Sequence, residues 1–253
     1  MDWKAWGVVS IFLIAVVSGC VQPGGGTGPN AGRVVFSATD AAAGMGTISH
    51  VWVTIDEMSV QSPTKGWITL STQPKTIDLL ELRADGRQVV LADVPVEAGT
   101  YNQLRLHISK VSVTDENGSS EARLPSGELK IVGGFTVDAN QTSVALFDFI
   151  ADESLHVTGN GKYVMAPVVI VSTTENAEVR TENNEIVEIR KGTPTINIKV
   201  GMRENGEVGE GLGIPLDAEV EVDSGGIKVK VGGTGGVDVD ININNGLRVR
   251  VGS

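Results

Sequence analysis

Apolar and polar residues alternate with a period of two over many short stretches of the chain. Between residues 101 and 113, Leu104, Leu106 and Ile108 alternate with polar residues, and the alternation resumes in a shifted phase after Lys110. A period of two predicts β-strands with one buried face, and the phase shift predicts a β-bulge.

Other β-rich stretches are bounded by Gly, Pro or Ser in the same way. They predict strands at residues 33–39, 48–60, 67–70, 128–132, 135–137, 142–149 and 162–171. The passage 77–82 (IDLLEL) has some helical character but is too short to decide. Many short strands favour an all-β fold, an antiparallel sandwich of residues 33–172.

The composition changes beyond about residue 173, where aromatic residues disappear. Apolar residues alternate with acidic or amide residues at 217–223 and 237–243, and with basic residues at 227–231 and 247–251. Gly- and Asn-rich connectors between these segments are typical of hairpins. We therefore expect a C-terminal β-meander within residues 173–253, in which acidic strands pair with basic ones. Its apolar face must pack on the preceding domain or on another subunit.

The amino terminus has the pattern of an export signal. Residues 5–17 are almost wholly apolar, which is too short for a membrane span and typical of a signal-peptide core. Val17-Ser18-Gly19-Cys20 and the Gly/Pro-rich residues after it resemble a lipoprotein lipobox with its tether. We expect a signal helix over residues 1–19, lipidation at Cys20 and a tether over residues 20–32. The alternative is an ordinary signal followed by a free thiol.

Composition excludes several classes of function. The 253 residues carry 20 Lys and Arg against 31 Asp and Glu, and a net charge of −11 argues against nucleic-acid binding. A single cysteine excludes a disulfide framework. The 32 glycines lack the period of collagen and indicate many turns, whereas aromatic residues are few.

Several stretches of residues 33–172 form a recognisable series. They are 36–41 (FSATDA), 50–55 (HVWVTI), 66–70 (GWITL), 77–82 (IDLLEL), 98–106 (AGTYNQLRL), 133–137 (GGFTV) and 161–168 (GKYVMAPV). Together they resemble the domain of unknown function 4382 family of bacterial and archaeal lipoproteins. The resemblance implies a transthyretin-like, Greek-key β-sandwich, a shape shared with carbohydrate-binding and adhesin modules. The role of the family is unassigned, so the resemblance implies no catalytic or ligand residue.

Trp52 and Trp67 are the candidate ligand residues, together with His50 and Asp56. Trp52 lies out of phase with the apolar residues of its strand, on the face of His50 and Asp56, and Trp67 shares a face with Thr69. An exposed aromatic ring beside polar groups suits stacking on a sugar. The alternative is that both rings cover the sandwich core and expose only an edge.

No metal or catalytic site is expected. His50, His107 and His156 are widely spaced and none belongs to a zinc-binding motif. Asp238, Asp240 and Asn242 superficially resemble a calcium loop, but the sixth position is Ile243 instead of Gly, and the alternation predicts a strand. The sequence carries no nucleophile, phosphate-binding or dinucleotide motif. We expect neither enzymatic activity nor a cofactor.

Asn117 and Asn140 each begin a glycosylation acceptor triplet, and Asn117 falls in a predicted hairpin turn. Two functions fit the whole pattern. The first is a non-catalytic, lipid-anchored module on the extracytoplasmic side of the cell membrane, which binds envelope carbohydrate or an envelope protein. The alternative is a structural envelope subunit that assembles by strand pairing of its C-terminal region.

Overall fold

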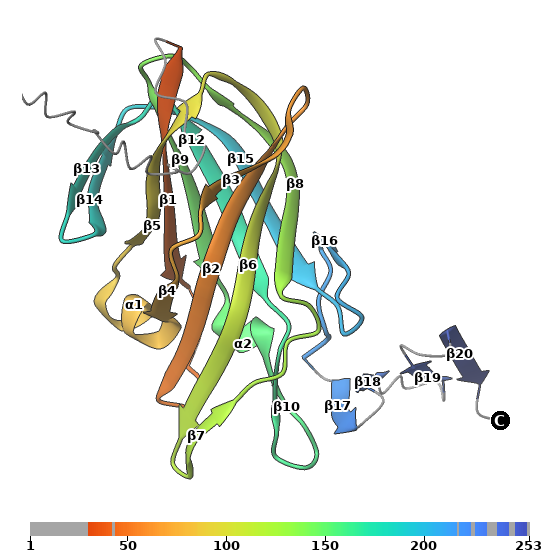
Figure 1. Cartoon of the computed structure of the whole chain (residues 1–253). Helices are drawn as coiled ribbons and strands as arrows, with labels where there is room; N and C mark the ends of the chain where they lie inside the picture. The colour runs from red at the N-terminus through yellow and green to blue at the C-terminus, as the bar shows by residue number, and fades with distance from the viewer. Residues whose placement is uncertain are drawn as a thin grey trace, which may run out of the picture.

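The computed structural model describes residues 30–41, 44–216, 218–223, 226–231, 237–242 and 246–251. Their strands form an all-β sandwich of two packed sheets, as expected (Figure 1). The expected signal segment, Cys20 and the tether as far as residue 29 lie outside the described residues.

The first layer is an eight-stranded sheet. In spatial order it contains β13 (Glu178–Glu182), β14 (Glu185–Arg190), β5 (Val89–Glu97), β1 (Ala31–Asp40), β9 (Thr142–Phe149), β12 (Val168–Glu175), β15 (Thr193–Met202) and β16 (Val208–Glu210). Unlike the expected antiparallel arrangement throughout, β1 and β9 run parallel. Parallel neighbours require a long crossover, which here contains the strands of the second layer and β5 of the first.

The second layer is a six-stranded sheet. It contains β3 (Gly66–Ser71), β2 (His50–Ser62), β6 (Gly99–Asp115) and β7 (Gly118–Glu121) in that order, with β4 (Lys75–Asp78) also paired to β2 and β8 (Glu128–Val137) to β6. Thr54 pairs with Lys110 but Ile55 pairs with Ile108, so the ladder skips Ser109. The bulge expected at this phase shift is confirmed.

Side chains between the two sheets form the main core. Alternate residues of β1, namely Val34, Phe36 and Ala38, point into it. The bulkiest fully buried residues of this core are Phe36, Phe135, Phe147 and Phe149. Burying each phenylalanine contributes about 1.5–3 kcal/mol, so these rings account for a large share of the stability.

The helical passage near residue 80 is divided between two elements. Ile77 and Asp78 belong to β4, and α1 (Leu79–Asp85) follows directly. The Asp78 carboxylate caps α1 by accepting a hydrogen bond from Leu80 N at 3.2 Å, and Gly86 ends the helix with a φ of 62°. These caps allow so short a helix to form. The second helix, α2 (Ala151–Ser154), is a single turn.

The sandwich extends beyond the boundary expected at residue 172. Strands β13 to β16 follow that residue and lie in the eight-stranded sheet, and Val200 of β15 is part of the main core. The change in composition therefore accompanies exposed strands of the same sheet. It does not mark the start of a separate unit.

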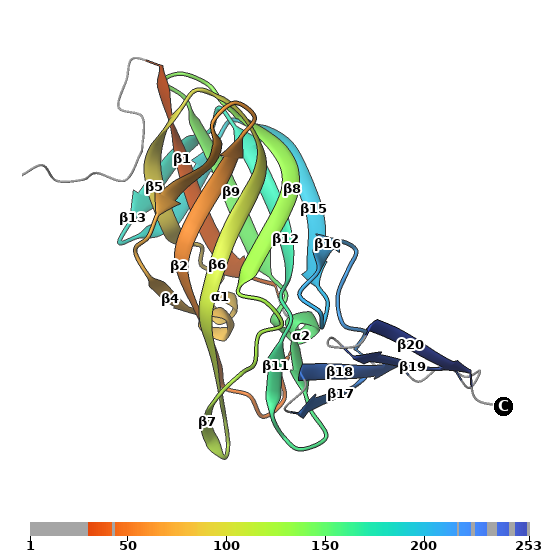
Figure 2. The ribbon, with the colours of Figure 1, turned by 45° about the vertical axis from the view of Figure 1, so that its right-hand side comes forward.

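Smaller hairpins lie at one end of the sandwich (Figure 2). They are β10 (Leu155–Val157) with β11 (Tyr163–Met165), β17 (Ala218–Asp223) with β18 (Gly226–Val231), and β19 (Val237–Asn242) with β20 (Gly246–Val251). The expected meander is thus two separate hairpins. The expected pairing of acidic with basic strands is present in both: the register places Glu219 opposite Lys230 in the first hairpin and Asp238 opposite Arg250 in the second.

The apolar face of the β17–β18 hairpin packs on the rest of the same chain. Val220, Ile227 and Val229 form a second, smaller core with Val164, Ala166, Met202 and Ile214. Of the two coverings considered for this face, the preceding domain is therefore the correct one for this hairpin.

The two ends of the sandwich differ in what they carry. The chain enters β1 at Ala31 at one end, at the top of Figure 1, and β2 begins at the other end. That second end also carries α1, α2, β7 and the small hairpins (Figures 1 and 2). Residues early in β2 are consequently remote from the point at which the N-terminal segment joins the sandwich.

Candidate functional site

Trp52 and Trp67 lie on the outer face of the six-stranded sheet, far from each other. Each keeps 36% of its surface exposed. Trp52 pairs with Ser112 near the start of β2, whereas Trp67 pairs with Gln61 near its end. The stretch of β2 between them spans about 30 Å at the usual strand rise, so one sugar ring cannot contact both. The four candidate residues thus divide among three places.

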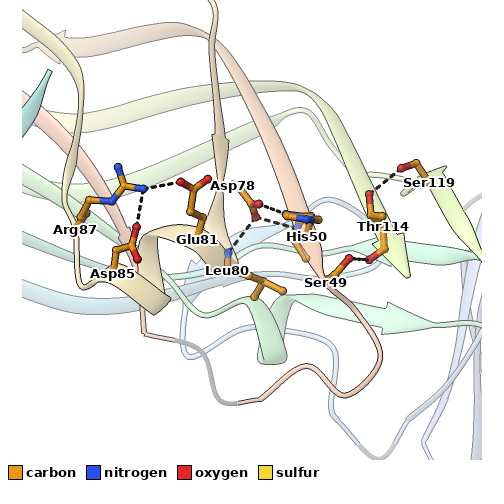
Figure 3. A network of polar contacts seen from close by, with 10 residues as sticks. Ser49, His50, Asp78, Leu80, Glu81, Asp85, Arg87, Thr114 and Ser119 are labelled. Carbon is orange, nitrogen blue, oxygen red and sulfur yellow. Dashed lines mark hydrogen bonds and ion pairs between the residues drawn. The ribbon is translucent and has the colours of Figure 1, made fainter. Parts of the chain in front are cut away.

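His50, Trp52 and Asp78 form the first place. The imidazole of His50 stacks on Trp52 with 5.6 Å between ring centroids and 18° between planes. Its Nδ1 is hydrogen-bonded to Asp78, whose carboxylate also accepts from Val51 N at 3.2 Å (Figure 3). Asp78 is buried while His50 is half exposed. The cap of α1 therefore also fixes the ring beside Trp52.

Short hydroxyl side chains occupy positions near Trp52 in the register of β2 with β4 and β6. Thr54 bonds to Thr76 at 2.9 Å across β2 and β4. Thr114 bonds to Ser119 at 2.8 Å across β6 and β7, as Figure 3 shows. Side chains this short cover little of a neighbouring indole. An aromatic surface bordered by hydroxyl groups and a fixed imidazole can stack on an apolar sugar face and bond to its hydroxyl groups.

Asp56 belongs to the second place, with His107. The β2–β6 pairing skips Asp56 as well as Ser109, which turns both side chains outward at adjacent bulges. His107 Nδ1 lies 2.5 Å from Asp56 Oδ1, and this hydrogen bond lowers the pKa of Asp56. Asp56 is about 13 Å along β2 from Trp52, so it is not part of the Trp52 cluster.

Trp67 belongs to the third place. The guanidinium of Arg105 lies 3.9 Å from the ring centroid of Trp67 and 3.4 Å from a carboxylate oxygen of Glu128. A cation–π contact of this kind covers one face of the indole. Each indole thus has a neighbour on one face, Arg105 at Trp67 and His50 at Trp52, and the two keep the same exposed fraction. Arg105 was not predicted from the sequence.

The histidines do not gather. His156 is buried in β10, while His50 and His107 lie on the outer face of the six-stranded sheet. Within the ranges that the structure describes, no three His, Cys, Asp or Glu side chains could share a metal ion. Asp238 and Asp240 lie in strand β19, opposite Arg250 and Arg248 of β20.

Both glycosylation triplets lie on the surface. Asn117 is exposed in the turn between β6 and β7. Asn140 is exposed between β8 and β9 with a φ of 60°. Their modification stays a prediction. Neither of the two described helices has the length and apolarity needed to span a membrane.

Residues 31–167 match the family model described as Domain of unknown function (DUF4382). The chain belongs to this family. The match covers β1 to β11 and so confirms the resemblance seen in the sequence. Curated proteins and solved structures, compared in turn, gave no match. Because the family description assigns no role, function has to be argued from the geometry of this member.

Proposed function

We propose that this DUF4382 protein is a lipid-anchored, non-catalytic module that binds carbohydrate on the outer face of its six-stranded sheet, around Trp52. The single observation that carries the proposal is the Trp52 ring, which is exposed, stacked on a carboxylate-held His50 and bordered by hydroxyl groups.

The anchor is proposed from the sequence, and the fold is compatible with it. Lipidation of Cys20 would hold the chain on the extracytoplasmic side of the membrane. The chain joins the sandwich at Ala31, the first residue of β1, at the end opposite to that at which β2 begins, and Trp52 is the third residue of β2. The Trp52 cluster would thus face away from the membrane, where envelope glycans are accessible.

The test compares Trp52→Ala with Trp67→Ala on a glycan array and in affinity electrophoresis with envelope polysaccharides. We expect Trp52→Ala to abolish retention, and Trp67→Ala to keep most of it because Trp67 lies at the other end of β2, outside the Trp52 cluster. Unchanged thermal unfolding of Trp52→Ala separates lost binding from lost folding. Equal retention by the wild type and Trp52→Ala would refute the carbohydrate proposal.

The anchor has a separate test. The wild type should incorporate labelled acyl chains and partition with membranes, whereas Cys20→Ser should do neither. An unlabelled wild-type chain would remove the anchor from the proposal without affecting the carbohydrate site.

The alternative function, assembly by strand pairing, would have to use the second C-terminal hairpin. The first hairpin is engaged: its apolar face is packed, and Val220 O on its β17 edge accepts a hydrogen bond from Gly159 N at 3.3 Å. Sedimentation of the full chain and of a chain ending at Val231 tests this alternative. A mass that rises with concentration only in the full chain would favour it.

A further inference from the structure

A cleft of about 370 Å³ opens on the edge of the sandwich, between β5 of one sheet and the gap that separates β3 from β4 in the other. The gap exists because the chain leaves the sheet at Thr72 and Pro74 ends the irregular link before β4. The volume falls within the range of about 300–1,000 Å³ that is usual for ligand pockets.

The cleft has an apolar floor and a polar rim. Leu70, Leu91 and Ala92, all buried, form the floor. The rim carries side-chain hydroxyl, amide and ammonium groups from Ser71, Thr72, Gln73, Lys75 and Asn184. A pyranose ring has the matching character, since it places an apolar face beside a circle of hydroxyl groups.

The edge of β5 adds backbone groups to the rim. Arg33 N donates to Gln141 O, away from β5, so Arg33 and Pro95 form a pair without mutual hydrogen bonds. By the same alternation, Asp93 directs its backbone N–H and C=O away from β1 and towards the cleft. These groups can bond to ligand hydroxyl groups.

One end of the cleft is closed by the tip of the β13–β14 hairpin. Asn183 and Asn184 have φ values of 50° and 66°, as in a type I′ turn. Asn184 O accepts from Val90 N at 2.8 Å, and its side-chain Nδ2 donates to Val90 O at 3.2 Å. The hairpin tip is therefore fastened to β5, and the end wall is fixed.

Lys75 gives the cleft its charge. Its ammonium contacts Asn184 Oδ1 at 3.5 Å, and within the described part of the chain no carboxylate lies within 4.0 Å of it. The one acid of the rim, Asp93, is already neutralised by Arg33 through two hydrogen bonds of 2.7 and 2.6 Å. In a protein with a net charge of −11, a cation left without a carboxylate partner favours an anionic ligand.

We propose that this cleft binds a sugar acid, with the carboxylate at Lys75, the ring on the apolar floor and the hydroxyl groups on the rim. One ammonium suits one carboxylate. The site lies on the edge of the sandwich and is separate from the Trp52 cluster on the outer face, so it goes beyond the function proposed above.

The test is calorimetric titration of the purified chain with glucuronate, with glucose and with acetate. We expect glucuronate to bind at least about tenfold more tightly than either of the others, because only it combines carboxylate and hydroxyl groups. Lys75→Gln should weaken glucuronate binding by about tenfold or more and leave glucose unaffected. Lys162→Gln, which removes an exposed lysine elsewhere, is the matched control and should bind as the wild type does.

Several outcomes would overturn the proposal. These are no glucuronate binding by the wild type, equal binding of glucuronate and acetate, or equal binding by the wild type and Lys75→Gln. Trp52→Ala distinguishes the two sites, because it should retain glucuronate binding. If Trp52→Ala loses that binding instead, the sugar acid is bound at the Trp52 cluster and the cleft proposal is wrong. Titration with a glucuronate oligomer then shows whether the chain binds the monomer or the oligomer more tightly. The preferred ligand must bind more weakly to Lys75→Gln than to the wild type, and equal binding of that ligand to both chains would contradict the cleft proposal.

Discussion

The hydroxyl of Tyr163 donates a hydrogen bond of 2.7 Å to Asp115 Oδ2, and this contact joins β11 to the end of β6. The carboxylate lies beside the phenol and raises the pKa of Tyr163 to about 12. The same hydrogen bond lowers the pKa of Asp115. A residue of the small hairpins is in this way fastened to the six-stranded sheet.

Both tyrosines of the chain are expected to ionise at a higher pH in the folded protein than in the unfolded chain. Burial raises the pKa of Tyr101, with a further contribution from Glu97, so neither phenol should ionise at its usual pH of about 10. Ultraviolet absorbance should show phenolate near pH 10 only after denaturation. Unfolded phenols lose their protons first, so the free energy of unfolding should fall as pH rises from about 10 to about 12. Tyr163→Phe should reduce that fall; an unchanged fall would contradict the assignment.

The buried His156 is expected to make the protein less stable in mild acid. The residue is buried, and burial lowers its pKa despite a hydrogen bond to the backbone of Glu153. Below the unfolded pKa of about 6.5 the unfolded chain binds the proton and the folded chain does not. The free energy of unfolding should therefore decrease as pH falls, by up to about 1.4 kcal/mol per pH unit. Denaturant unfolding of the wild type and His156→Gln from pH 8 to 5 measures the difference. Parallel curves would show that His156 is not the responsible group.

The positions of most strands were predictable from the sequence, because strands that pack on the main core alternate apolar and polar residues. The phase of Trp52 placed it outward, and the shift at Lys110 marked a bulge; the register agrees with both. The extent of the sandwich was not predictable, since β13 and β14 are exposed and resemble the C-terminal hairpins in composition. The pairings of β14 with β5 and of β15 with β12 show that the sheet continues.

Of the candidate site, only the outward-facing tryptophan rings were predictable from the sequence. His50 and Asp78 are 28 residues apart, and they meet because β4 pairs with β2 at Trp52. The Arg105–Trp67 contact likewise depends on the register of two strands with β2. Local sequence contains no signal for such cross-strand neighbours, nor for a cleft formed by two sheet edges.

Substitution of Gly201 by alanine is expected to destabilise the fold unusually strongly. A Cβ at this position would lie 1.8 Å from the carbonyl oxygen of Leu212, which is backbone and cannot turn aside. Gly201→Ala should therefore lower the free energy of unfolding by at least about 3 kcal/mol, at the upper end of overpacking effects.

Gly209, the cross-strand partner of Gly201, is the matched control. A Cβ there would meet only a flexible Leu212 methyl at 3.0 Å, so Gly209→Ala should cost about 1 kcal/mol or less. Chemical denaturation of both variants decides, and equal costs would contradict the close approach at Gly201.

Truncation of Ile227 is expected to open the β17–β18 hairpin locally. Its side chain is 1% exposed in the second core, and Ile→Ala substitutions in cores cost about 2–5 kcal/mol. An isolated two-stranded hairpin is marginally stable, so losing this contact should release the hairpin instead of unfolding the sandwich. Hydrogen exchange of Ile227→Ala should speed up within β17 and β18 while β2 and β6 stay protected.

Leu216→Ala is the matched control for Ile227→Ala, because Leu216 lies just before the hairpin and is 68% exposed. Its exchange should equal that of the wild type, since an exposed side chain contributes little burial. If Ile227→Ala instead lowers protection equally in β2, β6 and β18, the hairpin and the sandwich unfold as one cooperative unit. In that case the second core, which includes Met202 of the eight-stranded sheet, couples the hairpin to the sandwich.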